Sequence, residues 1–194
     1  PTQREWSALD VATGAGHTAL AFAPLVARVV ASDVTDAMLR ETEKLAEARG
    51  LTNVETAKGE AGNLPFADSS FDLVTCRLAA HHFPDASAFV AESFRVLKPG
   101  GFFALVDNIS PDEKMLPLAT PAEALNAART FNTFEKTRDP SHARALSLEE
   151  WLALMRKAGF TAITSELLDQ HIAFAPWTER MRCTPETVEV LKSM

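Results

Sequence analysis

The stretch from Ser7 to Gly16 constrains the fold more than any other part of the chain. It begins with an apolar run that only Asp10 interrupts, which is typical of a strand buried on both faces of a parallel sheet. Thr13-Gly14-Ala15-Gly16 follows, and an apolar helical pattern starts directly after it, at Ala19. Strand, glycine turn and helix in this order are typical of doubly wound α/β folds, which bind nucleotide-like ligands at the carboxyl ends of their strands. The sequence therefore predicts an α/β fold with a doubly wound, mostly parallel sheet.

A second apolar run, Val29–Ser32, ends at Asp33. An acidic side chain there can accept hydrogen bonds from both hydroxyls of a ribose, and its separation from the glycines fits the roughly 20-residue spacing of dinucleotide-binding folds. The glycines allow the backbone to approach a ligand closely, because a Cβ would occupy that space. Taken alone, however, the glycines are also what a tight turn of any α/β protein needs.

The glycine pattern favours a ligand without phosphates. Gly14-x-Gly16 lacks the third glycine with which helix and strand pack closely around the pyrophosphate of NAD. Asp10 precedes the glycines, where its side chain could receive an amino group. S-adenosylmethionine carries a ribose and an ammonium group but no phosphate, so it is the predicted ligand. An NAD-linked oxidoreductase is the less favoured alternative.

The chain continues to alternate strands and helices as far as residue 106. We expect further strands at Val54–Ala57, Phe71–Cys76 and Phe102–Val106, and helices over His17–Ala27, Thr35–Arg49 and Asp85–Leu97. Beyond residue 110 the sequence predicts helices over Ala122–Thr133, from a capping box at Ser147 through Ala158, and from Thr184 onward, with a largely extended strand over Phe160–Phe174. We expect a single domain, 1–194, in which 1–110 forms the cofactor-binding core, 111–146 a lid or insertion, and 147–194 the C-terminal part.

This topology places two further segments beside the same ligand site. In the loop Gly59–Phe66, the Glu60 carboxylate is positioned to accept a hydrogen bond from an adenine amino group, and Ala61 offers a backbone N–H to the ring. Arg77–Phe83 lies at the carboxyl end of the fourth strand, again at the ligand-binding edge. Taken alone, a loop glutamate such as Glu60 would be a solvated charge in most proteins.

Five segments, in order and correctly spaced over residues 7–107, resemble the motifs of class I S-adenosylmethionine-dependent methyltransferases. They are Leu9–Gly16, Ala31–Asp33, Gly59–Phe66, Ser70–Val74 and Leu97–Gly101. The nearest branch is type 11, which includes the ubiquinone/menaquinone-biosynthesis C-methyltransferases. The resemblance implies S-adenosylmethionine as cofactor, bound by Asp10, Ala12, Thr13, Gly14, Gly16, Asp33, Val34, Met38, Glu60, Ala61 and Arg77. Glu60 stands where the family usually has Asp, and it keeps a carboxylate that can accept the hydrogen bond.

The resemblance is narrower in the second half of the chain. Residues 111–194 resemble only small-molecule members, through Arg138–Arg144. Enzymes of this class usually have a helical segment before the first strand and close the sheet with an antiparallel seventh strand, and we recognise neither in this sequence. We therefore expect a methyltransferase fold that lacks both elements, with the chain trimmed at both ends.

Methyl transfer from a sulfonium is an in-line displacement, in which the protein mainly aligns the acceptor with the methyl carbon. A base is needed only where the acceptor carries a proton of high pKa, and His81 and His82 at the end of the fourth strand are the candidates. The alternative is a histidine packed under the sheet edge. Arg138, His142 and Arg144 could hold a carboxylate or phenolate acceptor, or these side chains could be solvated or paired within the insertion.

Composition and charge narrow the function further. The net charge of −7 argues against a nucleic-acid or membrane binder, and Ala79–Phe83 stands where a nucleic-acid methyltransferase would carry an Asn/Asp-Pro-Pro-Tyr/Phe motif. Cys76 and Cys183 have neither the spacing of a metal site nor that of a disulfide framework, so we expect no metal and an unreactive Cys76. We recognise no signal peptide and expect a cytoplasmic enzyme with a small-molecule acceptor. A non-catalytic S-adenosylmethionine-binding protein is the other alternative. Acceptor identity and oligomeric state do not follow from the sequence.

Overall fold

The computed structural model of the chain describes residues 3–194, which form two compact units. The first unit runs to Asp107 and also contains Lys157–Gly159. The second unit consists of Asn108–Arg156 and Phe160–Met194. In the described part of the chain, none of the helices has both the length and the apolar character needed to cross a membrane.

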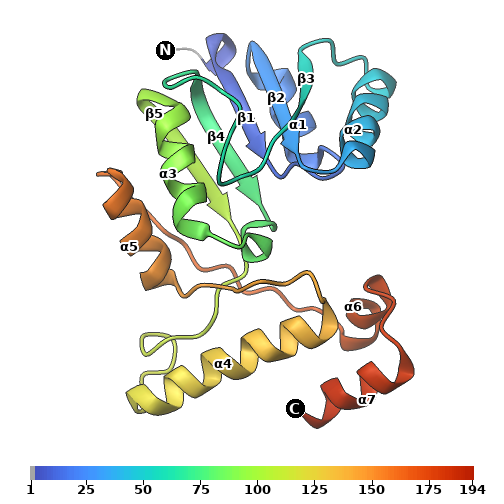
Figure 1. Ribbon diagram of the computed structural model, residues 1–194, viewed down its shortest axis with the longest axis vertical. Coiled ribbons are helices and arrows are strands. Elements are labelled where there is room, and N and C mark those ends of the chain that lie inside the picture. Colours follow the sequence, from blue (N-terminus) through green and yellow to red (C-terminus); the bar gives the residue numbers. More distant parts are fainter. Residues whose placement is uncertain (1–2) are drawn as a thin grey trace. The chain divides into compact units, whose positions relative to one another are not determined.

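The first unit is built on a five-stranded sheet in the order β3-β2-β1-β4-β5 (Figure 1). The strands are β1 (Ser7–Val11), β2 (Arg28–Asp33), β3 (Val54–Lys58), β4 (Phe71–Arg77) and β5 (Leu97–Val106). All four neighbouring pairs are parallel, so the carboxyl ends of the strands meet at one edge. The predicted α/β fold with a mostly parallel sheet is therefore confirmed, as are the positions of all five of these strands.

Helices of the first unit pack on this sheet. They are α1 (His17–Phe22), α2 (Asp36–Ala48) and α3 (Ala86–Val96), with 3-10 turns η1 (Gln3–Glu5), η2 (Ala23–Leu25) and η3 (Ala80–His82). Helix α1 contacts β1 and β2, α2 contacts β2 and β3, and α3 contacts β5. Helix α1 ends five residues earlier than the sequence indicates, because Pro24 has no N–H to continue it and the chain tightens into η2.

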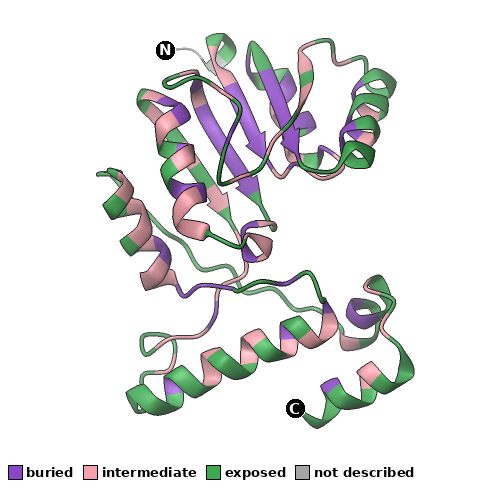
Figure 2. Cartoon of the chain, viewed as in Figure 1, coloured by how far each residue is buried: buried purple, intermediate pink, exposed green. Residues whose placement is uncertain are grey.

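The central strands carry the core of the first unit. The side chains of Leu9, Val30 and Val74, on three adjacent strands, are almost fully buried. Figure 2 shows this burial running along β1, β2 and β4. A strand covered on both faces has a near-continuous apolar sequence, and such apolar runs predicted β1, β2 and β4 correctly.

The second unit contains α4 (Pro121–Arg138), α5 (Leu148–Ala158), α6 (Phe174–Arg180) and α7 (Pro185–Ser193). Helix α4 opens with a capping box of Thr120 and Glu123 and runs five residues beyond its predicted end. The predicted capping box of α5 is present: the Ser147 N–H donates to the Glu150 carboxylate over 2.9 Å, and the Glu150 N–H donates to the Ser147 hydroxyl over 3.3 Å. Thr184 caps α7 in the predicted position.

The strand predicted over Phe160–Phe174 is wrong. In the structure this segment has no regular secondary structure before α6 begins at Phe174. A strand is stable only where its backbone pairs with a neighbour, and none of the described strands pairs with this segment. Leu167, Leu168 and Ile172 are also exposed, so apolar residues of this segment face solvent.

Candidate functional site

The carboxyl ends of β1 and β2 bring the glycine turn and Asp33 together. The Gly14 N–H donates to Asp33 Oδ2 over 2.9 Å, and the Thr35 N–H donates to Asp33 Oδ1 over 2.9 Å. Asp33 is 7% exposed, yet its carboxylate stands at the edge where the turn from Ala12 to Gly16 begins. The glycine turn and Asp33, which are separate in the sequence, are therefore joined by a direct hydrogen bond.

The turn after β1 has an unusual backbone. Ala12, Gly14 and Gly16 all have positive φ, of 53°, 56° and 81°. The left-handed region costs an alanine roughly 1–2 kcal/mol, and Leu78 at the end of the neighbouring β4 shares it with a φ of 53°. Strained residues of this kind cluster at functional sites, so two adjacent strand ends carrying them mark this edge.

The two glycines are required for different reasons. A Cβ on Gly14 would meet none of the described heavy atoms within 4 Å, so the turn presents bare backbone to open space there. A Cβ on Gly16 would lie 2.5 Å from Thr42 Cγ2, because α1 packs tightly on α2 at this point. Gly14 thus suits close approach of a ligand, whereas Gly16 suits the packing of the helix that follows.

Hydrogen bonds to the buried Asp10 carboxylate hold the turn in place. Asp10 is 2% exposed, and its carboxylate accepts hydrogen bonds from Thr13 Oγ1 (2.6 Å), the Ala19 N–H (3.2 Å) and Thr75 Oγ1 (2.6 Å). Burial raises the pKa of Asp10, and these hydrogen bonds oppose the increase. Both carboxylate oxygens are therefore engaged by donors from three elements, and contact of Asp10 with a ligand's amino group remains a prediction.

The remaining predicted cofactor residues lie at or after the ends of β2, β3 and β4. Val34 is 55% exposed and Met38 36% exposed, so accessible apolar surface lies at the start of α2. The Gly59 N–H donates to the Asp33 carbonyl over 3.2 Å, and this contact anchors the loop that carries Glu60 and Ala61. Arg77, exposed at the end of β4, exerts a charge that lowers the pKa of Asp10. Which of these residues touch a cofactor remains a prediction.

His81 and His82 lie in η3, directly beyond β4. The His81 N–H donates to Asp107 Oδ2 over 2.8 Å, and His81 Nδ1 lies 2.5 Å from Asp107 Oδ1. The His81 side chain is 7% exposed and that of Asp107 is 1% exposed, while the two histidine rings are 4.2 Å apart between centroids. The structure thus fixes the orientation of the His81 imidazole through Asp107.

Asp107 was not among the residues that the sequence singled out. It follows β5 directly, and Val106 pairs with Arg77 in the register of β4 and β5. Since adjacent parallel strands end at one edge, an acidic residue at the end of the fifth strand could have been expected beside a histidine at the end of the fourth.

A comparison with known protein families matches a part of the chain that lies within the first unit. Residues 9–105 match the family described as Methyltransferase domain. The chain belongs to this methyltransferase family.

Similar proteins support the family assignment. The uncharacterized methyltransferase YcgJ of Bacillus subtilis (strain 168) is 43% identical over 150 residues, which cover 77% of this chain and 55% of YcgJ. The crystal structure of YcgJ superposes with a TM-score of 0.89 at 34% identity, over 98% of this chain and 77% of that chain. The uncharacterized protein YafE of Escherichia coli (strain K12) is 37% identical over 89% of this chain and 78% of YafE.

A demethylmenaquinone methyltransferase of Geobacillus kaustophilus (strain HTA426) is 38% identical over 56% of this chain and 48% of its own length. The chain therefore aligns with only about half the length of this relative and of YcgJ. The resemblance to class I methyltransferases, including the ubiquinone/menaquinone branch, is confirmed, and with it S-adenosylmethionine as the cofactor of the family.

Cys76 of this methyltransferase chain lies inside the sheet. It is 1% exposed, and burial raises the pKa of its thiol well above the ordinary value, with the charges of Asp107 and Asp10 adding to the effect. A thiol that stays protonated is a poor nucleophile. The position of Cys76 in β4 therefore agrees with the unreactive strand residue that the sequence indicates.

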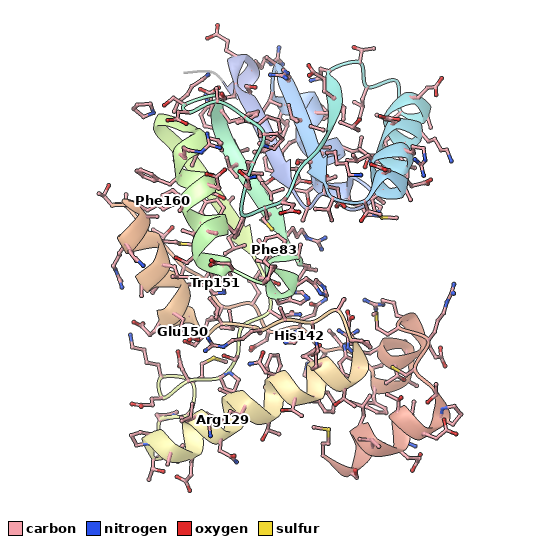
Figure 3. All side chains as sticks on the ribbon, in the orientation of Figure 1. Phe83, Arg129, His142, Glu150, Trp151 and Phe160 are labelled. Carbon is pink, nitrogen blue, oxygen red and sulfur yellow. The ribbon has the colours of Figure 1, made fainter. Side chains whose placement is uncertain are left out.

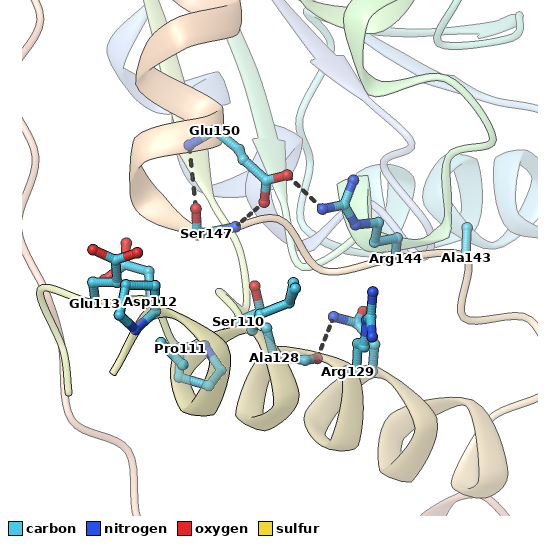
Figure 4. Close-up of a pocket in the computed structure, with 14 residues that line it drawn as sticks. Ser110, Pro111, Asp112, Glu113, Ala128, Arg129, Ala143, Arg144, Ser147 and Glu150 are labelled. Atoms are coloured by element: carbon cyan, nitrogen blue, oxygen red, sulfur yellow. Dashed lines mark hydrogen bonds and ion pairs between the residues drawn. The ribbon is translucent and has the colours of Figure 1, made fainter. Parts of the chain in front are cut away.

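The structure gives the three predicted acceptor residues different partners. Arg138 donates to Glu135 Oε2 over 2.9 Å and lies 4.4 Å from the centroid of the Trp177 ring. His142 is 1% exposed, and its Nε2 is 2.9 Å from Asn132 Oδ1. Arg144 forms an ion pair with Glu150 and, unlike the other two, lines a cavity in the second unit (Figure 4). Contact of any of the three with an acceptor remains a prediction.

The surroundings of Arg138 predict that it stabilises the second unit. We expect Arg138→Ala to lower the free energy of unfolding by about 3 kcal/mol, because Glu135, whose side chain is 10% exposed, would lose its cation. Arg144→Ala is the matched control, since its ion pair is largely exposed and such pairs contribute about 1 kcal/mol or less. Urea denaturation of the full chain measures both. Equal losses of stability in the two variants would contradict this account of Arg138.

Proposed function

We propose that this chain catalyses S-adenosylmethionine-dependent methyl transfer to a small-molecule acceptor. The observation that carries the proposal is the hydrogen bond between the Gly14 N–H and the Asp33 carboxylate, at a strained turn that presents bare backbone to open space. Membership of the methyltransferase family supports the same activity. The net charge of −7 favours a small molecule over nucleic acid as the acceptor.

The residues at the sheet edge suit the groups of S-adenosylmethionine. The Asp33 carboxylate is an acceptor for ribose hydroxyls, and the exposed side chains of Val34 and Met38 provide apolar surface for a flat base. Gly14 leaves room for the ligand where any other residue would place a Cβ. Bound there, S-adenosylmethionine supplies a methyl group on a sulfonium, which needs no further activation by the protein. The chain's own task is to hold and align the acceptor.

The acceptor class follows from weaker observations. Two of the relatives are named demethylmenaquinone methyltransferases. The first acceptor to test is therefore demethylmenaquinone in its reduced, phenolic form. We propose that residues 111–146 act as a lid and determine acceptor specificity, as long connections in compact domains often do. Arg144 supports this part of the proposal because it lines a cavity, whereas Arg138 is engaged with Glu135 and Trp177.

For an acceptor that must lose a proton, we propose His81 as the base, with Asp107 as its positioning residue. An imidazole held at Nδ1 by a carboxylate can exchange a proton at Nε2. Asp107 holds both the His81 backbone and its Nδ1, so the ring is fixed in one orientation. His82 lies in the same turn and is more exposed than His81, so it serves as the comparison residue.

Replacing His81 tests this role. We expect His81→Gln to lower turnover of reduced demethylmenaquinone by about 10²–10⁴-fold, the usual contribution of a positioned base, without changing the affinity for S-adenosylhomocysteine. His82→Gln should have a much smaller effect on turnover. Radiolabelled methyl transfer and calorimetry provide the two readouts. Wild-type turnover in His81→Gln would rule out the base.

Replacing Asp33 tests the cofactor site itself. We expect Asp33→Ala to weaken binding of S-adenosylhomocysteine roughly ten- to hundredfold, because hydrogen bonds to a charged acceptor contribute about 1.5–3 kcal/mol. Isothermal titration calorimetry with the full chain measures this loss. Glu47→Ala, which removes an exposed carboxylate from α2, is the matched control and should bind as the wild type does.

The same titration separates the competing functions. Tight binding of NAD by the wild type, with no response to S-adenosylhomocysteine, would favour an NAD-linked oxidoreductase. Binding of S-adenosylhomocysteine without turnover of any phenolic or carboxylic acceptor would favour a non-catalytic binding protein. Unchanged affinity in Asp33→Ala would contradict the site proposed here.

A further inference from the structure

A cavity of about 610 Å³ lies within the second unit, between α4 and the segments that flank it (Figure 4). Ligand sites in proteins commonly have volumes of roughly 300–1,000 Å³. The lining comes from 110–113, from α4 between Pro121 and Asn132, and from 143–150. On the α4 side of the cavity the apolar lining residues are Pro121, Ala124, Leu125 and Ala128, and Pro111 adds one from 110–113.

Hydrogen bonds within the unit hold these walls in place. Asn132 is the central residue, because its Oδ1 accepts from the Ala145 N–H over 2.7 Å while its Nδ2 donates to the Ala145 carbonyl over 3.2 Å. The Ser110 N–H donates to the Leu146 carbonyl over 3.0 Å and ties 110–113 to 143–150. The cavity is therefore bounded by backbone that is fixed by hydrogen bonds, as a preformed binding site requires.

One of the two arginines that line the cavity is in an ion pair and the other is not, among the described residues. Arg144 is neutralised by Glu150, whose other oxygen accepts the Ser147 N–H. Arg129 projects from α4 (Figure 3), and no ion pair joins its guanidinium to any residue in the described part of the chain. A guanidinium at the edge of an apolar wall is a recognition group for a planar anion such as a carboxylate.

The opposite end of the cavity is acidic. Asp112 and Glu113 lie there, away from Arg129 and Arg144 in the close-up (Figure 4). Asp112 Oδ1 accepts from the N–H groups of Lys114 and Met115 over 3.0 and 3.1 Å. These two carboxylates would repel a second anion and would accept a hydrogen bond from a hydroxyl or amino group.

We propose that this cavity binds a small monocarboxylic acid with an apolar, hydroxyl- or amino-substituted body. The carboxylate pairs with Arg129, the body rests on the apolar wall of α4, and the polar substituent points to Asp112 and Glu113. The site lies wholly within the second unit and goes beyond the proposed function, with Arg129 as its specificity residue. It places the anion on Arg129 rather than on Arg138.

Three probes with the same ring test the proposal: 4-hydroxybenzoate, its neutral amide 4-hydroxybenzamide, and the dicarboxylate terephthalate. The readout is a ¹H–¹⁵N NMR titration of the full chain, which gives both affinity and location. We expect 4-hydroxybenzoate to shift the amide signals of 128–132 and 143–147, and to bind about tenfold or more tightly than either analogue, as expected for a charge-assisted hydrogen bond. Equal affinities for the three probes would overturn the proposal.

Variants of Arg129 complete the test. Arg129→Gln should abolish the preference for the carboxylate, Arg129→Lys should retain part of it, and Arg180→Gln, which removes an exposed arginine of α6, should retain all of it. Undiminished binding of 4-hydroxybenzoate to Arg129→Gln would overturn the proposal. S-adenosylhomocysteine is titrated into the same samples. If it binds and 4-hydroxybenzoate does not, the cavity proposal fails and the proposed function stands; the reverse result leaves the cavity and removes the cofactor site.

Discussion

The buried carboxylate of Asp10 is the interaction on which the first unit depends. It joins β1, the glycine turn, the start of α1 and β4 through hydrogen bonds to Thr13, Ala19 and Thr75. Burying a carboxylate is unfavourable, as the raised pKa of Asp10 reflects, and the three donors offset that cost. Because the turn is held in this way, the Gly14 N–H reaches the Asp33 carboxylate, and these two groups of the proposed cofactor site lie side by side.

Local signals in the sequence were sufficient to predict this edge of the sheet. The strands around Asp10, Asp33 and Cys76 are buried on both faces, so their apolar runs predicted them, and their parallel order placed Asp33 beside the glycine turn. The same reasoning did not predict that Ala12 and Leu78 would adopt positive φ, since nothing in an alanine or a leucine indicates a left-handed conformation.

Features that depend on partners distant in sequence were not predictable in the same way. Asp107 pairs with His81 across 26 positions, and only the register of β4 and β5 brings them together. The segment 160–173 has strand-like composition but lacks a strand to pair with among the described residues. For Arg138 the sequence left open an anion or a partner within the insertion; the structure pairs it with Glu135, and its second partner, Trp177, lies 39 positions later in the chain.

A crystal structure of the full chain with S-adenosylhomocysteine tests the central claim most directly. The account predicts the ribose hydroxyls within about 2.6–3.2 Å of the Asp33 carboxylate, with the ligand lying over Gly14. Unchanged positions of Asp10, Thr13 and Thr75 would agree with a turn that is already formed in the free protein. A nucleoside bound away from the ends of β1 and β2, without contact to Asp33, would contradict the account.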